Sequence, residues 1–140
     1  MAGILENLMT AIYSKATGNA AFNTAMGGRI YQEQARTANG TPVTTYPYAV
    51  FKHISDYPKY TFTSDYADVL IQWSLYDNSP SPANMQTYIT KLQSAFDDTS
   101  LSITGWTLIR VSREGHVVLP PDENGMRHSA TTYRILAQKN

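Results

Sequence analysis

The fold class is decided by the stretch YADVLIQWSLY, residues 66–76. Apolar side chains occupy every second position from Ala67 to Leu75, and Asp68, Gln72 and Ser74 fall between them. This alternation with a period of two is typical of a β-strand in a sheet with one buried face. The stretch therefore predicts such a strand, and the remaining elements are placed relative to it.

Further strands are predicted on both sides of this stretch. Before it, residues 48–55 are rich in aromatic and β-branched side chains and predict a strand, which residues 56–59 end as a turn. After it, residues 106–112 and 131–138 predict two more strands. The connection from Arg113 to Ala130 is long for a hairpin, so we expect either a protruding β-arm or a flexible loop there.

Helices are predicted in three places. Apolar residues from Ile4 to Ala16 recur at the three-and-four spacing of one helical face. A shorter helix is expected over residues 20–26, with Asn19 as its N-cap. A third helix begins at Ser81-Pro82, which suit the N-cap and the first helical position, and ends at Asp97-Asp98.

Two segments between the second helix and the first strand have less regular patterns. Gly27-Gly28 stops the helix, and Arg29-Ile30-Tyr31 leaves it in an extended conformation. Residues 32–45 are polar and aperiodic, so we expect a long mobile loop. The predicted order is helix, helix, strand, strand, helix, strand, strand. It predicts one α+β domain, residues 1–140, with helices packed on one face of a mostly antiparallel sheet.

The composition disfavours several classes of function. The 140 residues have a formal net charge of zero, whereas dedicated nucleic-acid binders usually show a basic excess. Cysteine is absent, which excludes disulfides, thiolate catalysis and cysteine-based zinc sites. Only 16% of the residues are charged and ten are tyrosines. Low charge with many tyrosines indicates a surface covered in an assembly, and a tyrosine-rich sheet surface without a partner is the alternative.

Neither a membrane segment nor a reactive site is predicted. No run approaches the roughly 18 apolar residues of a membrane span, and no signal peptide is recognised, so we expect a protein made and used in a cytosol or in a particle assembled there. His53, His116 and His128 lack the spacing of metal ligands. Asp65 and Asp68 are three residues apart and point to opposite faces of a strand. We expect no catalytic residues, metal or cofactor. A small hydrolase that uses these residues and a nucleic-acid adaptor that uses the scattered arginines are lower-ranked alternatives.

In their order along the chain, these segments resemble the tail-completion or tail-terminator family of long-tailed bacteriophages. The resemblance covers essentially the whole chain. It rests on the N-terminal helix with Leu5, Leu8 and Ile12, GGRIY at 27–31, YPYAV at 46–50, VLIQWS at 69–74, the helix 82–96 and TYRI at 132–135.

The resemblance implies a structural role without catalysis or a cofactor. Family members are similar to ring-forming proteins, typically hexamers, that cap the tail tube at its final length and join it to the DNA-filled head. The implied partners are other copies of this chain, the tail tube protein and the head connector proteins, with DNA only in transit through the ring. The implied location is the tail or neck of the virion, after assembly in the host cytoplasm. A head-side connector ring and a tail tube subunit are the alternative structural roles.

The residues that contact neighbouring subunits are expected in the two long connections. A ring built from head-to-tail contacts needs two different patches on each subunit, and two projecting loops can supply them. The expected inter-subunit or connector contacts are Gln34, Arg36, Asn39, Thr41, His116, Val118, Asp122 and Arg127.

Overall fold

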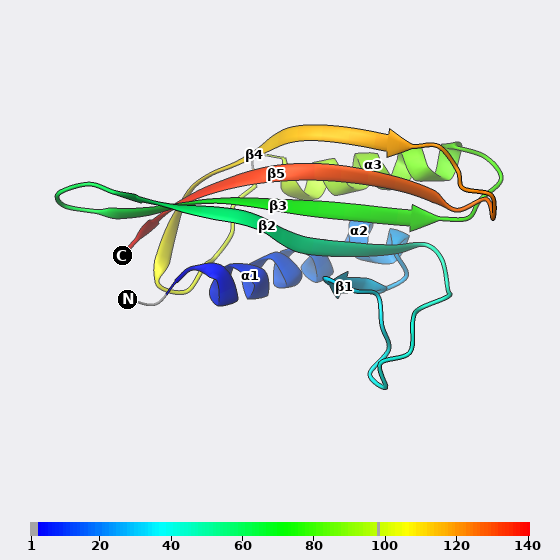
Figure 1. Cartoon of the computed structure of the whole chain (residues 1–140), viewed down its shortest axis with the longest axis horizontal. Helices are drawn as coiled ribbons and strands as arrows, with labels where there is room; N and C mark the ends of the chain where they lie inside the picture. Colours follow the sequence, from blue (N-terminus) through cyan, green and yellow to red (C-terminus); the bar gives the residue numbers. More distant parts are fainter. Residues whose placement is uncertain (1–2, 98) are drawn as a thin grey trace.

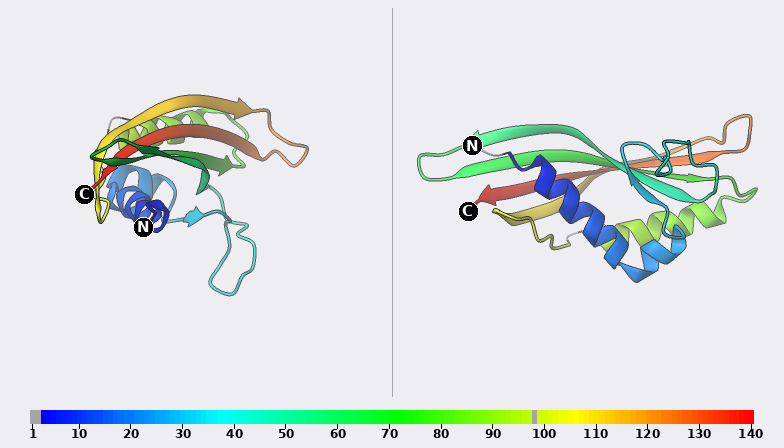
Figure 2. Two further views of the ribbon diagram at one scale, coloured as in Figure 1. Left: turned by 60° about the vertical axis from the view of Figure 1, so that its left-hand side comes forward. Right: turned by 90° about the horizontal axis from the view of Figure 1, so that it is seen from below.

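The computed structural model describes residues 3–97 and 99–140 and shows an α+β fold (Figure 1). Within these residues a mixed five-stranded sheet, ordered β1-β2-β3-β5-β4, forms one layer. Three helices form the second layer on one face of the sheet (Figure 2). The elements in chain order are α1 (Leu5–Gly18), α2 (Ala20–Ala25), β1 (Ile30–Gln32), β2 (Tyr48–Tyr60), β3 (Asp65–Asp77), α3 (Ala83–Phe96), β4 (Trp106–Leu119) and β5 (Arg127–Lys139).

The alternating stretch forms β3, in the middle of the sheet. It pairs antiparallel with β2 on one side and with β5 on the other. Ala67, Val69, Ile71, Trp73 and Leu75 are all buried on the face that the helices cover. The alternation therefore identifies the core face of the sheet correctly.

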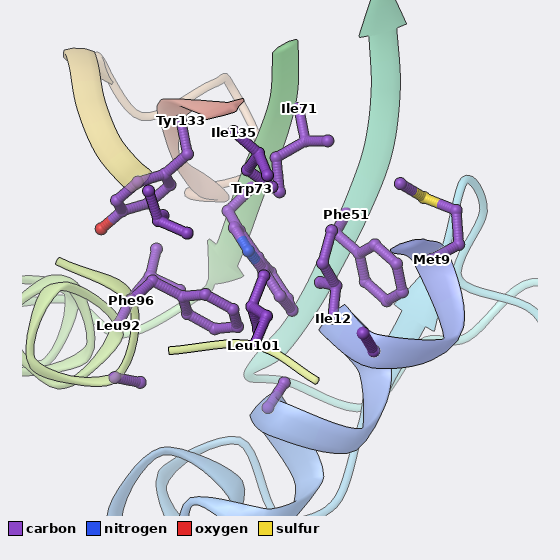
Figure 3. Close-up of a cluster of buried hydrophobic side chains, with 14 of the residues drawn as sticks. Met9, Ile12, Phe51, Ile71, Trp73, Leu92, Phe96, Leu101, Tyr133 and Ile135 are labelled. Atoms are coloured by element: carbon purple, nitrogen blue, oxygen red, sulfur yellow. The ribbon is translucent and has the colours of Figure 1, made fainter. Parts of the chain in front are cut away.

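Trp73 lies at the centre of the core (Figure 3). Its ring meets Phe22 of α2 edge-on, with the ring centroids 5.5 Å apart. Phe51 of β2 and Phe96 of α3 lie 4.9 and 5.2 Å from it. Ile12 of α1 also belongs to this buried cluster. A single large side chain thus packs against both layers, so the position of the helices over the sheet depends on it.

The predicted helix ends are found at the expected places. Asn19 caps α2, because its Oδ1 accepts a hydrogen bond from the backbone N–H of Phe22 at 3.0 Å. Gly27 follows α2 with a φ of 61°, in the left-handed region that favours glycine at helix ends. The predicted end of α3 is Asp97-Asp98. Asp97 is the C-cap of the helix, and Asp98 lies outside the described residues.

The start of α3 lies close to its predicted position. α3 begins at Ala83, one residue later than predicted, and its N-cap is Pro82 instead of Ser81. Ser81 Oγ still accepts a hydrogen bond from the backbone N–H of Ala83 at 3.2 Å, just before the first turn. In the described part of the chain, none of the helices is both long and apolar enough to cross a membrane.

The structure corrects two strand predictions and decides between the alternatives for a third segment. Residues 56–59 are not a turn but belong to β2, which is an edge strand there and tolerates Pro58. Ile30–Gln32, expected only as an extended exit, pairs parallel with Ala49–Phe51 and adds a strand to the predicted order. Of the alternatives for the connection 113–130, the β-arm is observed, because β4 runs to Leu119 and β5 begins at Arg127.

Candidate assembly surfaces

The two connections expected to make contacts lie at the same end of the molecule (Figure 1). One is the segment 33–47 between β1 and β2, and the other is the turn 120–126 between β4 and β5. They touch, because the hydroxyl of Tyr46 donates a hydrogen bond to Sδ of Met126 at 3.4 Å. We call this combined surface the loop end.

The loop end rests on a row of stacked rings on the face of the sheet away from the helices. Tyr46, Tyr48, Tyr76 and His128 form this aromatic ladder, with successive ring centroids 5.3, 4.9 and 4.4 Å apart. The ladder crosses β2, β3 and β5, which are far apart in sequence. Burial, together with the charge of Lys52, lowers the pKa of His128 and so favours its neutral ring. The ladder is an aromatic support beneath the loops.

The segment 33–47 is tied to the body of the protein by Arg29. Its guanidinium donates to the carbonyl oxygen of Pro47 at 2.8 Å and to that of Tyr46 at 3.2 Å. Within the segment, Arg36 donates to Gln34 Oε1 and to the carbonyl of Gly40, both at 2.7 Å. The segment expected to be a mobile loop therefore has an internal hydrogen-bonded structure.

An open groove of about 290 Å³ separates this segment from the outer face of the sheet. Its walls combine apolar, aromatic and polar side chains, a composition suited to contact with another protein. The lining residues are Glu33, Gln34, Ala35, Arg36, Pro42, Val43, Tyr48, Val50 and Tyr76.

The turn 120–126 is held both internally and by a neighbouring segment. Asp122 Oδ1 accepts hydrogen bonds from the backbone N–H groups of Asn124 at 2.9 Å and Met126 at 2.8 Å. The guanidinium of Arg127 donates to the carbonyl oxygens of Ser79 at 3.0 Å and Pro80 at 2.9 Å. These bonds link the turn to the connection between β3 and α3.

The eight expected contact residues fall into two groups. Gln34, Arg36, Asp122 and Arg127 make side-chain hydrogen bonds that hold the loop end in shape, and His116 makes one within the sheet. The side chains of the others are exposed: Asn39, Thr41 and Val118.

Two of these residues were expected in a connection but lie in β4. His116 and Val118 pair with Thr131 and Ser129 of β5, because the strand continues past its predicted end. The His116 ring lies 2.9 Å from Thr131 Oγ1. Burial, together with the charge of Arg113, lowers the pKa of His116.

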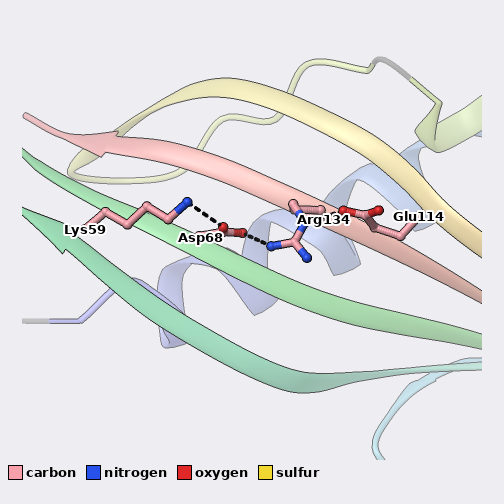
Figure 4. A network of polar contacts seen from close by, with 4 residues as sticks. All are labelled: Lys59, Asp68, Glu114 and Arg134. Atoms are coloured by element: carbon pink, nitrogen blue, oxygen red, sulfur yellow. Dashed lines mark hydrogen bonds and ion pairs between the residues drawn. The ribbon is translucent and has the colours of Figure 1, made fainter.

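A second feature of the outer face is a row of charges across four strands (Figure 4). Lys59 of β2 contacts the carboxylate of Asp68 on β3 at 3.1 Å, and Arg134 of β5 contacts it at 2.8 Å. Arg134 also contacts Glu114 of β4. Burial opposes ionisation of Asp68, which is 6% exposed, but the hydrogen bonds from Lys59 and Arg134 outweigh it and lower its pKa. Sequence reasoning missed this charged row because its members lie far apart along the chain.

The opposite end of the molecule is the β2–β3 hairpin, which projects beyond the helices (Figure 1). At its tip, residues 61–64, the hydroxyl of Thr61 accepts a hydrogen bond from the N–H of Ser64 at 2.9 Å. Phe62 is fully exposed there, and Tyr57 and Tyr60 on the hairpin are also exposed. We call this hairpin tip the arm end. The arm end was not expected from the sequence, because residues 56–59 resemble a turn but belong to β2.

The described residues show no cluster of three or more His, Asp or Glu side chains that could hold a metal ion. The three histidines lie on separate strands, His53 on β2, His116 on β4 and His128 on β5. Asp65 and Asp68 occupy opposite faces of β3, and the carboxylate of Asp68 forms ion pairs with Lys59 and Arg134.

Comparison with protein families identifies the chain. The family model described as Tail completion protein gp17 matches residues 10–138. The chain belongs to this family. The resemblance noted from the sequence is therefore confirmed, and this tail completion family member is a structural protein of a phage tail, located in the tail or neck of the virion.

The fold of this family member also occurs in a solved structure, described as the virion of a native gene transfer agent (GTA) particle. One chain of that structure superposes with a TM-score of 0.85 at 12% sequence identity, and the match covers 99% of both chains. At this identity the likeness shows the fold alone. Comparison with curated proteins finds no match.

Proposed function

We propose that copies of this chain form a closed ring, a hexamer, which caps the tail tube at its final length and presents the surface to which the head is joined. The observation that carries the proposal is membership of the tail completion family over residues 10–138. The ring contacts other copies of the chain, the tail tube protein and the head connector proteins. In this role residues 1–140 act as one domain, without catalysis or a cofactor.

The shape of the molecule supports a ring subunit. A head-to-tail ring requires two different surfaces on each subunit. The two sides of the sheet, formed by β4 and by β2 beyond Phe51, are two such surfaces. The loop end and the arm end lie at the opposite ends of the molecule (Figure 1), where they are free to contact the tail tube and the head connector. A subunit that takes part in two interfaces of standard size gives up about 1,600 Å², which is roughly a fifth of its 7776 Å² of accessible surface.

The charge of the chain is compatible with DNA in transit. Proteins that hold DNA do so mainly by neutralising phosphates with an excess of Lys and Arg. The chain has 11 basic and 11 acidic side chains and a formal net charge of zero. A ring built from it allows DNA to pass through the opening without retaining it.

Removal of the gene product from assembling particles tests the proposal. We expect heads and tails that remain unjoined, and tail tubes that exceed their normal length, because nothing caps them. Electron microscopy measures both the joining and the length distribution, and supply of the wild-type protein should restore them. Joined particles with normal tail lengths would contradict the proposal.

Assembly of the purified protein separates the capping ring from the alternative structural roles. Native mass spectrometry, with and without isolated tail tubes, should detect a closed oligomer, and the tubes should then stop growing. Long tubes formed by this protein alone would instead identify a tube subunit. A strict monomer in the presence of tubes would contradict the ring.

A further inference from the structure

The sheet has two long open edges, on its opposite sides. β1 pairs only with Ala49–Phe51 of β2. From Lys52 onward, β2 is therefore paired with β3 on one side and with no strand of the described chain on the other. At the other side of the sheet, β4 pairs with β5. Apart from the pairing with β3 and β5, one backbone hydrogen bond reaches these two edges among residues 3–97 and 99–140. It runs from the N–H of Trp106, at the start of β4, to the carbonyl oxygen of Ile103. Each edge therefore presents a row of backbone donors and acceptors that another strand can bind.

The end of β4 lacks the features that usually protect an edge strand. Charged side chains and bulges commonly block such edges, and β4 has them between Ile109 and Glu114. The following run, Gly115–Leu119, contains no Asp, Glu, Lys or Arg. Val117 and Val118 in this run are each 56% exposed. An uncharged apolar edge of this kind favours pairing with another strand.

The directions of the strands make the two edges complementary. β2, β3, β5 and β4 are each antiparallel to the next, so β4 runs opposite to β2. When a second copy is placed beside the first by a rotation about an axis along the strands, its β2 meets β4 in the antiparallel sense. The alternation of strand directions then continues from one subunit to the next, as in a single antiparallel sheet.

We infer that the open edge of β4 in one copy pairs antiparallel with Lys52–Tyr57 of β2 in the next copy, so that neighbouring subunits share one continuous sheet. This inference rests on the proposed ring and names the contact that closes it. The paired segment of β2 begins where β1 ends and stops before Pro58, which has no N–H to donate. This segment has a bulge at Ile54 and the charged residues Lys52 and Asp56, so the unprotected side of the contact is β4. Ile54 and Tyr57 are exposed on the segment and add apolar contact with β4.

Cysteine cross-linking tests the pairing directly, because the natural chain contains no cysteine. One sample of the protein carries Lys52→Cys or Tyr57→Cys on β2, and a second sample carries one cysteine on β4. Each chosen β4 position lies on the outer face of the sheet, as Lys52 and Tyr57 do, according to the strand registers. The β4 positions are Arg110, Ser112, Gly115, Val117 and Leu119.

The two samples are mixed, assembled with tail tubes and oxidised. Side chains directly opposite each other in an antiparallel pair have Cβ atoms about 4.5–5.5 Å apart, close enough for a disulfide to form with small adjustment. We expect Lys52→Cys to cross-link to a position nearer the C-terminal end of β4 than the position that cross-links to Tyr57→Cys. A single-cysteine variant on the exposed surface of α3, Thr90→Cys, measures the background.

The outcomes distinguish this inference from the ring itself. The antiparallel β4–β2 contact would be overturned if Lys52→Cys cross-linked nearer the N-terminal end of β4 than Tyr57→Cys. It would also be overturned if disulfides between two copies of the same variant formed in higher yield than those between β2 and β4. Rings seen by native mass spectrometry without cross-links above the Thr90→Cys background would overturn it too, while the ring remains supported. Absence of any oligomer, with and without tubes, would contradict both proposals.

A charge placed on the edge gives an independent test. Val117→Lys and Val118→Lys should each lower the fraction of protein in rings at least tenfold, because a lysine on an edge strand opposes pairing. Both side chains are largely exposed, so the urea unfolding midpoint should stay unchanged. Thr90→Lys adds the same charge on α3 and should leave ring formation intact. An unchanged ring fraction in both valine variants would contradict the inference.

Discussion

At the scale of single residues, the stability of the fold is concentrated at Trp73. The side chain is fully buried and contacts rings from β2, α2 and α3. Its indole Nε1 is buried without a hydrogen-bond partner among the described residues. Trp73 therefore acts through its size and its ring contacts, and its polar group adds nothing to stability.

We predict that Trp73→Ala lowers the free energy of unfolding by about 3–5 kcal/mol, the usual loss for a large aromatic side chain in a core. Trp73→Phe should cost clearly less, because it keeps an aromatic ring and removes a buried donor that has no partner. Urea unfolding followed by circular dichroism measures both. Equal losses in the two variants would contradict the prediction.

At the scale of elements, the charged row couples β2, β3, β5 and β4 through Asp68. The hydrogen bonds from Lys59 and Arg134 lower the pKa of this carboxyl in the folded protein, despite its burial. A lowered folded-state pKa means that the unfolded chain binds the proton more readily. The contribution to stability is therefore present above the unfolded-state pKa of about 3.9, and it is lost as the pH falls through the folded-state value.

We predict that Asp68→Asn lowers the urea unfolding midpoint at pH 7. The difference from the wild-type protein should begin to shrink as the pH falls below about 4, because Asp68 of the unfolded wild-type chain then binds a proton, and it should vanish at lower pH, where the folded carboxyl is protonated too. Unfolding curves at pH 7, 4 and 3 measure the change. A difference between the two proteins that stays constant over this range would contradict the prediction.

Arg29 has a comparable role for the loop end, because it fixes the end of the segment 33–47 through two backbone carbonyls. We predict that Arg29→Ala lowers the free energy needed to open the segment 33–47 locally by about 1–3 kcal/mol, since hydrogen bonds from a charged donor are lost. Amide hydrogen exchange should become faster over residues 33–47, with β3 unchanged. Arg110→Ala is the matched control, because this exposed arginine lies on β4, outside the loop end. Faster exchange throughout β3 would instead indicate a general loss of stability.

At the scale of the whole molecule, the arm end carries an exposed aromatic side chain that the fold does not use. Phe62 is fully exposed at the tip of the projecting hairpin. Under the proposed function it contacts a neighbouring subunit or the tail tube. We predict that Phe62→Ser changes the free energy of unfolding by less than about 0.5 kcal/mol, as usual for surface substitutions, and lowers the yield of joined particles.

Thr63→Ala at the same tip is the matched control, because that side chain is exposed and is not aromatic. Electron microscopy of particles complemented with each variant measures joining and tail length, and thermal unfolding measures stability. Normal joining by the Phe62→Ser protein would exclude the arm end from the contacts required for tail completion.

Local features of the sequence were sufficient to predict much of the fold. The alternation from Ala67 to Leu75 predicted the central strand and its buried face, because side chains in a strand point to alternate sides. Asn19 and Ser81 predicted helix starts, because their side chains reach backbone N–H groups two or three residues away. Each of these signals depends on neighbours along the chain, so the sequence alone contains it.

The candidate surfaces could be predicted only in part. The two long connections were recognised, but their meeting at the loop end depends on the contact between Tyr46 and Met126, 80 positions apart. The charged row joins Asp68 to Arg134 across 66 positions. Sequence patterns contain no information on which distant strands become neighbours, so neither contact was expected.

The sequence by itself thus determined the α+β class, the buried face of β3, the helix ends and the family. The tertiary structure decided how far the hairpins extend, where β1 pairs and which edges of the sheet stay open. The physical reason is that strand pairing depends on a neighbour brought from elsewhere in the chain. Residues 56–59 contain a proline and resemble a turn, yet they form a strand because β3 lies beside them.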